Sequence, residues 1–128
     1  MSKNETWLTR WYWEQVGGTL VEEFMAVRRR ADCAQRLLDG VIIKDGELRI
    51  ARQSEVSLEG KDIVVVQTKD NRLGMYLMGQ TLFSAKLVER FHPRSIESVA
   101  LCTKDDAELR PLLEQYAGMK VVVYPDSC

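Results

Sequence analysis

The sequence predicts an α/β fold in which a mixed central β-sheet is flanked by helices. Residues 63–66 form an uninterrupted apolar run of strand length, which indicates a strand buried on both faces in the middle of a sheet. After this run, helical and strand patterns alternate along the chain, and helical crossovers require parallel pairing of the strands that they join. With 128 residues and ordinary apolar content, the chain is expected to form a single domain over residues 1–128.

The first expected elements are a helix and a strand. Residues 5–16 place apolar side chains at helical spacing on one stripe, and a glycine pair at 17 and 18 ends the pattern. Residues 19–27 mix β-branched and aromatic residues with two glutamates. This composition predicts a strand near a sheet edge, and continuation of the helix through the glutamates is the alternative.

The next segment predicts a strand and a hairpin. Residues 36–43 form the second expected strand, and Asp45-Gly46 is a tight-turn signal. Residues 48–51 alternate as a short antiparallel partner of that strand would. The expected order in the first half is therefore a helix, two or three strands and the buried strand.

The second half predicts two helix–strand units. Residues 73–91 have helical spacing and are closed by Pro93, and residues 95–103 follow as a strand. Residues 105–116 form a second helix and residues 120–124 a final apolar strand. The chain therefore consists of an αβββαβ core with an added C-terminal α-β unit.

Charge and cysteine content limit the function classes. The formal net charge of −1 provides no overall attraction to nucleic acid, so any such binding needs a local basic patch. Three cysteines without C-x-x-C spacing and a single histidine disfavour a disulfide scaffold and a structural zinc site. A polar N-terminus without a long apolar run predicts neither a signal peptide nor a membrane span. A cytoplasmic, reducing location is expected.

Asp39, Gln67 and Lys69 are the strongest candidates for a site. Asp39 interrupts an apolar strand, and Gln67 and Lys69 end the buried one. Side chains alternate along a strand, so Gln67 and Lys69 project from one face, and the three residues converge if the two strands pair. Such a face could hold a divalent metal beside a basic group. The structural alternatives are a turn or bulge at Asp39-Gly40 and an ordinary polar strand end at Gln67 and Lys69.

This order of a helix, strands bearing Asp and then x-x-Lys, a helix and a strand resembles the PD-(D/E)XK, or restriction-endonuclease-like, nuclease superfamily over residues 5–103. The resemblance implies that Asp39 and Gln67 bind Mg²⁺ or Mn²⁺ and that Lys69 positions or activates the attacking water. Gln67 stands where the family has a second acid. An amide oxygen can coordinate a metal but brings no charge. Either another carboxylate supplies the missing negative charge, or the metal site is weakened or lost.

Two further positions follow from the resemblance. Many members use an additional carboxylate on the first helix, for which Glu5 and Glu14 are candidates. Nine positions at about 3.6 residues per turn put them on nearly opposite faces, and Glu5 shares the apolar stripe that faces the sheet. Gln80, an amide on the helix after Lys69, is a possible supporting residue, and we expect it to contact a polar group.

Partners of the chain follow from its basic and aromatic residues. Arg28, Arg29, Arg30 and Arg36 surround the second strand, where they either contact phosphates or form a solvated surface. Three tryptophans spread around the first helix, so at least one is expected to be partly exposed. The leading hypothesis is a metal-dependent phosphodiesterase acting on DNA, with a homodimer implied by the resemblance. The alternatives are a catalytically inactive nuclease-like binding module and an unrelated α/β domain that binds a protein through the tryptophan-bearing helix.

Overall fold

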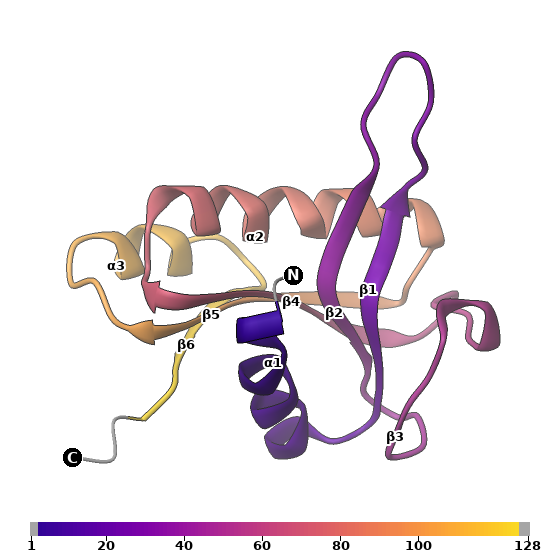
Figure 1. The fold of residues 1–128 in the computed structure, drawn as a ribbon, viewed down its shortest axis with the longest axis horizontal. Coiled ribbons are helices and arrows are strands. Elements are labelled where there is room, and N and C mark those ends of the chain that lie inside the picture. Colours follow the sequence, from indigo (N-terminus) through magenta and orange to yellow (C-terminus); the bar gives the residue numbers. More distant parts are fainter. Residues whose placement is uncertain (1–2, 126–128) are drawn as a thin grey trace.

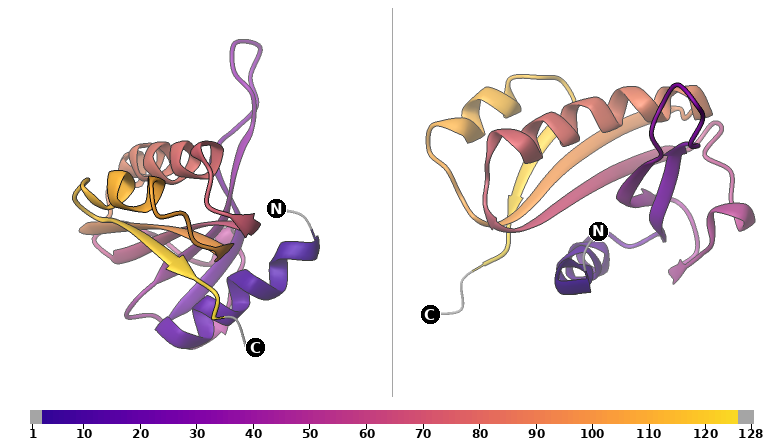
Figure 2. Two further views of the ribbon diagram at one scale, coloured as in Figure 1. Left: turned by 90° about the vertical axis from the view of Figure 1, so that its left-hand side faces the viewer. Right: turned by 45° about the horizontal axis from the view of Figure 1, so that its top comes forward.

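A central six-stranded sheet with helices on both faces forms the protein in a computed structural model, which describes residues 3–125 (Figure 1). Helix α1 lies on one face, and α2 and α3 lie on the other (Figure 2). None of the helices that the structure describes is long and apolar enough to cross a membrane. The elements in chain order are α1 (Lys3–Val16), β1 (Thr19–Val27), β2 (Arg36–Ile43), β3 (Arg49–Ile50), a 3₁₀ turn (Gln53–Glu55), β4 (Asp62–Arg72), α2 (Met75–Val88), a 3₁₀ turn (Glu89–Phe91), β5 (Ser95–Lys104), α3 (Leu109–Glu114) and β6 (Met119–Val123).

The sheet is mixed, as the sequence predicts. Its strand order is β3-β1-β2-β4-β5-β6. Strand β2 pairs antiparallel with both β1 and β4, whereas β4, β5 and β6 run parallel to one another. Helices α2 and α3 provide the crossovers that this parallel half requires. With the two-residue strand β3 counted as an addition, the αβββαβ order and the added α-β unit are both present.

The predicted hairpin at residues 48–51 is wrong. The two-residue strand β3 pairs in parallel with β1, with Thr19 opposite Arg49, instead of antiparallel with β2. Both edges of β2 are already occupied by β1 and β4, so the chain must cross to the outer edge of β1. Local alternation in the sequence predicts a strand here, but it does not show which strand edge is free to pair with it.

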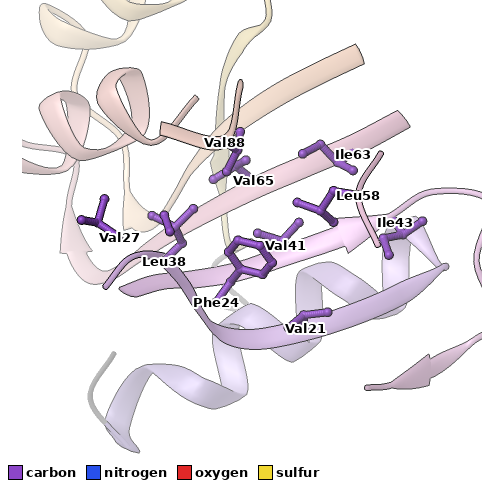
Figure 3. Close-up of a cluster of buried hydrophobic side chains, with 11 residues drawn as sticks. Val21, Phe24, Val27, Leu38, Val41, Ile43, Leu58, Ile63, Val65 and Val88 are labelled. Carbon is purple, nitrogen blue, oxygen red and sulfur yellow. The ribbon is translucent and has the colours of Figure 1, made fainter. Parts of the chain in front are cut away.

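Apolar side chains fill both faces of the sheet, as expected for a sheet between two helical layers. The cluster beneath α2 gathers residues from β1, β2, β4 and α2, including Phe24, Val41 and Val65 (Figure 3). On the other face, Leu8 and Tyr12 of α1 pack against Val64 and other residues of β2, β4 and β5. Strand β4 supplies both clusters and is the buried central strand that the sequence predicts.

The β1–β2 hairpin changes direction at its middle. Val21 and Phe24 lie in the same cluster beneath α2 although three positions separate them, and Leu38 and Val41 do the same on β2. Regular strands would place such residues on opposite faces, so alternation breaks in both strands between these pairs. Glu23, in the break, has a left-handed φ of 51°. Beyond it the hairpin rises past α2 (Figures 1 and 2); we call residues 28–37 the arm.

Candidate functional site

Asp39 lies where β2 separates from β4. Regular pairing of the two strands ends at Gly40 opposite Val66. In the next position, Oδ2 of Asp39 accepts a hydrogen bond from the backbone N of Thr68 at 2.8 Å. The side chain is buried, with 9% exposure. The carboxylate therefore takes the place of a strand carbonyl and continues the pairing where the backbone of β2 has turned away.

Gln67 joins three elements through its amide. Its Oε1 accepts from the backbone N of Asp39 at 3.4 Å, and its Nε2 donates to Oγ of Ser84 on α2 at 2.6 Å. The residue is 3% exposed. Asp39 and Gln67 therefore lie side by side, as predicted. The amide of Gln67, however, is used to connect β2 to α2. Sequence reasoning missed the partner Ser84, because α2 also carries Gln80 and Thr81 and no local pattern singles out the serine.

Glu5 also binds the backbone of β4. Its Oε2 accepts from the backbone N of Asp70 at 2.8 Å, and α1 is fixed nearby by the 2.8 Å hydrogen bond between the hydroxyls of Thr9 and Thr68. Glu14 is exposed. The helical-phase prediction that Glu5, and not Glu14, faces the sheet is confirmed.

The carboxylates of Asp39 and Glu5 line one edge of β4. Backbone N–H groups two residues apart in a strand point to the same side, and the two acceptors bind the amides of Thr68 and Asp70. These amides are about 7 Å apart along the strand. Lys69 lies between them in sequence and is exposed. The end of β4 therefore carries the ammonium of Lys69, and its backbone binds one carboxylate from β2 and one from α1.

Burial raises the pKa of Asp39 above its ordinary value. The hydrogen bond from Thr68 opposes this shift, whereas the negative charge of Glu23 adds to it. Burial is the largest of these causes. The protonated form of this carboxyl is thus favoured relative to an exposed aspartate.

Mg²⁺ needs several hard oxygen ligands around one point. Here the carboxylates of Asp39 and Glu5 bind separate backbone amides, and the oxygen of Gln67 is directed at the backbone N of Asp39. Within residues 3–125, no three His, Cys, Asp or Glu side chains gather closely enough to share a metal ion. These residues do not form a closed ligand set in this arrangement.

A groove of about 550 Å³ lies between the arm and α2. Gln67 and Ser84 are buried residues of its lining, and the arm contributes Arg36 and Leu37. Gln80 also lines the groove, but it is exposed. The expectation that Gln80 needs a polar partner assumed a buried helix face; water satisfies an amide on this exposed one.

The predicted nucleic-acid-binding arginines all lie on the arm. Arg28, Arg29, Arg30 and Arg36 are exposed. Arg30 pairs with Asp32 at 3.1 Å, whereas the other three make no ion pair with any residue that the structure describes. The arm therefore presents a concentrated positive charge on a chain whose net charge is −1.

The tryptophan-bearing helix α1 is partly covered. Trp7 is 44% exposed, as predicted for at least one of the three rings. The rings of Trp7 and Trp11 both make edge contacts with Tyr124, at centroid distances of 5.0 and 4.9 Å. These contacts give the tryptophans a packing role within the chain.

Comparison with models of protein families, with curated proteins and with solved structures found no match to this chain.

Proposed function

We propose that this chain is a DNA-binding domain on a nuclease-like scaffold, in which the arm contacts the phosphate backbone. The observation that carries the proposal is the projecting arm, with four exposed arginines against one aspartate between residues 28 and 36. Exposed guanidinium groups bind phosphates in bidentate geometry and release condensed counterions from the nucleic acid. The arm projects from the sheet, so its arginines can approach a strand or a duplex (Figure 1).

The use of Gln67 supports binding without catalysis. The resemblance implies an acid at this position, whereas this residue is neutral and bridges Asp39 to Ser84. A carboxylate could accept from the backbone N of Asp39, but it would also place a second negative charge beside a buried aspartate. We infer that the neutral amide of Gln67 connects β2 to β4 here without adding a second negative charge.

Fluorescence anisotropy with labelled DNA at several salt concentrations tests the proposal. The variant Arg28→Gln/Arg29→Gln/Arg36→Gln should bind about tenfold or more weakly and lower the salt slope by about 3, because each lost phosphate contact lowers it by about one. The variant Lys61→Gln/Arg90→Gln/Lys120→Gln removes the same charge from exposed positions outside the arm. Equal losses in both variants, or no binding of the wild type, would contradict the proposal.

A metal-dependent phosphodiesterase acting on DNA is the second candidate. It is favoured by the two carboxylates, Asp39 and Glu5, on one edge of β4 beside Lys69. Such a site would rely on Glu5 to supply the charge that Gln67 lacks. The test is cleavage of a mixed DNA panel with Mg²⁺ or Mn²⁺ by the wild type and Lys69→Ala, together with Mn²⁺ calorimetry of Asp39→Asn. Cleavage that is unchanged in Lys69→Ala, or absent altogether, rules this candidate out.

Two further parts of the proposal concern the setting of the chain. A homodimer is implied by the resemblance, and sedimentation velocity measures it directly. A cytoplasmic location is consistent with Cys33 and Cys102, which are both free thiols.

A further inference from the structure

Helix α2 has large apolar side chains on its outer face. Its buried positions include the small or polar residues Thr81, Ser84 and Ala85. Its exposed positions include Met75, Tyr76 and Phe83, with exposures of 75%, 82% and 66%. A surface helix normally keeps its large apolar residues toward the core, whereas α2 buries only Leu77 and Val88 of that kind and exposes these three. A patch of exposed apolar side chains marks a surface that binds a ligand or a partner molecule.

These exposed side chains line the same groove that the arm closes from the other side. Tyr76 and Phe83 are two helical turns apart, which separates them by about 10 Å along α2. Across the groove lie Gln35 and Arg36 of the arm. The groove therefore combines two aromatic rings, amide groups and a guanidinium.

We propose that this groove binds the unpaired bases of single-stranded DNA, with bases stacked on Tyr76 and Phe83 and phosphates held by the arm. The inference rests on the proposed function and names its substrate class. Aromatic rings stack on any base once it is unpaired, and a positive surface beside them follows the backbone. In a duplex the base faces are already stacked, so a duplex would contact the arm and leave both rings uncovered.

Charge favours DNA over a second copy of the chain in this groove. The arm borders the groove with Arg36. Val27 pairs with Arg36 across the hairpin, so Arg28 and Arg29, which follow Val27, add to the positive charge of the arm. A two-fold dimer through α2 would bring two such arms toward the same interface, where like charges repel. A strand of phosphates instead neutralises the arm while its bases cover the rings.

The experiment measures anisotropy of labelled oligothymidine and of a duplex of the same length. Oligothymidine should bind more tightly than the duplex. Tyr76→Ala and Phe83→Ala should each weaken oligothymidine binding about tenfold and leave duplex binding unchanged, and Tyr76→Phe should retain binding because it retains the ring. Tyr116→Ala, which removes a 56% exposed ring from beyond the end of α3, is the matched control.

The outcomes separate this inference from the proposed function. Equal binding of both probes, or unchanged oligothymidine binding in Tyr76→Ala and Phe83→Ala, overturns the groove proposal, while loss of duplex binding in the arm variant still supports the function. If neither probe binds, both proposals fail. A dimer in sedimentation velocity that Phe83→Ala abolishes would instead assign the groove to a second copy and overturn the inference.

Discussion

Strands β2 and β4 are joined in two different ways along their length. From Gly40 to Ile43 they form a regular antiparallel ladder with apolar residues on both faces. From Asp39 onward, side chains make the junction, with the carboxylate of Asp39 on the amide of Thr68 and the amide of Gln67 on the backbone of Asp39. The first region binds the strands through repeated backbone groups, and the second through two specific side chains.

The difference shows which part of the sheet sets its stability and which part sets the geometry of the candidate site. The ladder is stabilised by burial and by pairing that any apolar sequence could supply. The side-chain junction allows β2 to turn away from β4, and the arm stands away from the sheet (Figure 2). The groove lies between this arm and α2. Stability resides in the ladder, whereas the geometry of the candidate site depends on Asp39 and Gln67.

A core truncation in the ladder should produce the largest effect. Ile63 is fully buried in the cluster beneath α2, so Ile63→Ala removes apolar burial and leaves a cavity. We expect a loss of about 3 kcal/mol in the free energy of unfolding, measured by urea denaturation. Ile50→Ala in β3, at a residue that is 42% exposed, should cost less than about 1 kcal/mol. Equal losses in the two variants would show that the ladder does not contribute more to the free energy of unfolding than the sheet edge does.

Removing the amide of Gln67 should have an intermediate effect. Gln67→Leu keeps the volume but leaves Ser84 and the backbone N of Asp39 without this partner in a buried place, which should cost about 2 kcal/mol. The double variant Gln67→Leu/Ser84→Ala should recover part of the loss because both polar partners are removed together. Purely additive losses in urea denaturation would show that the 2.6 Å bond contributes nothing.

The two regions also differ in how far the sequence predicts them. The ladder was predictable because the apolar run at 63–66 and the runs of β-branched residues report burial directly. The convergence of Asp39 and Gln67 followed from pairing those strands. Ser84 as a partner, and the turning of the hairpin at Glu23, depend on three-dimensional contacts that no local pattern encodes. The exposure of Gln80 was missed because α2 is apolar on its outer face as well.

Asp39 should make the stability of the junction depend on pH. Its pKa is raised in the folded state, so the folded protein holds this proton more tightly than the unfolded chain does. The contribution of Asp39 therefore falls as pH rises from about 4 through the raised pKa. Asp39→Asn keeps an oxygen that accepts from Thr68 but cannot ionise, so at pH 7 it should be the more stable of the two proteins.

The pH range provides the control for this prediction. At about pH 3 both the aspartate and the asparagine are neutral, and the difference between the two proteins should nearly disappear. Thermal denaturation at several pH values measures it. If the wild type instead gains stability relative to Asp39→Asn between about pH 4 and 7, the ionised form is the favoured one and the burial argument is wrong.

The smallest effect is expected at Glu5, where it separates the two candidate functions. Glu5→Gln preserves an oxygen that can accept from the backbone N of Asp70 and removes only the charge, so stability should change by about 0.5 kcal/mol or less, with the exposed Glu14→Gln as control. If the second candidate is right, Mn²⁺ affinity in calorimetry should fall in Glu5→Gln and not in Glu14→Gln. A binding module without a metal site predicts no Mn²⁺ binding in the wild type or in either variant, because Gln67 leaves the end of β4 with too few converging charges to hold the ion.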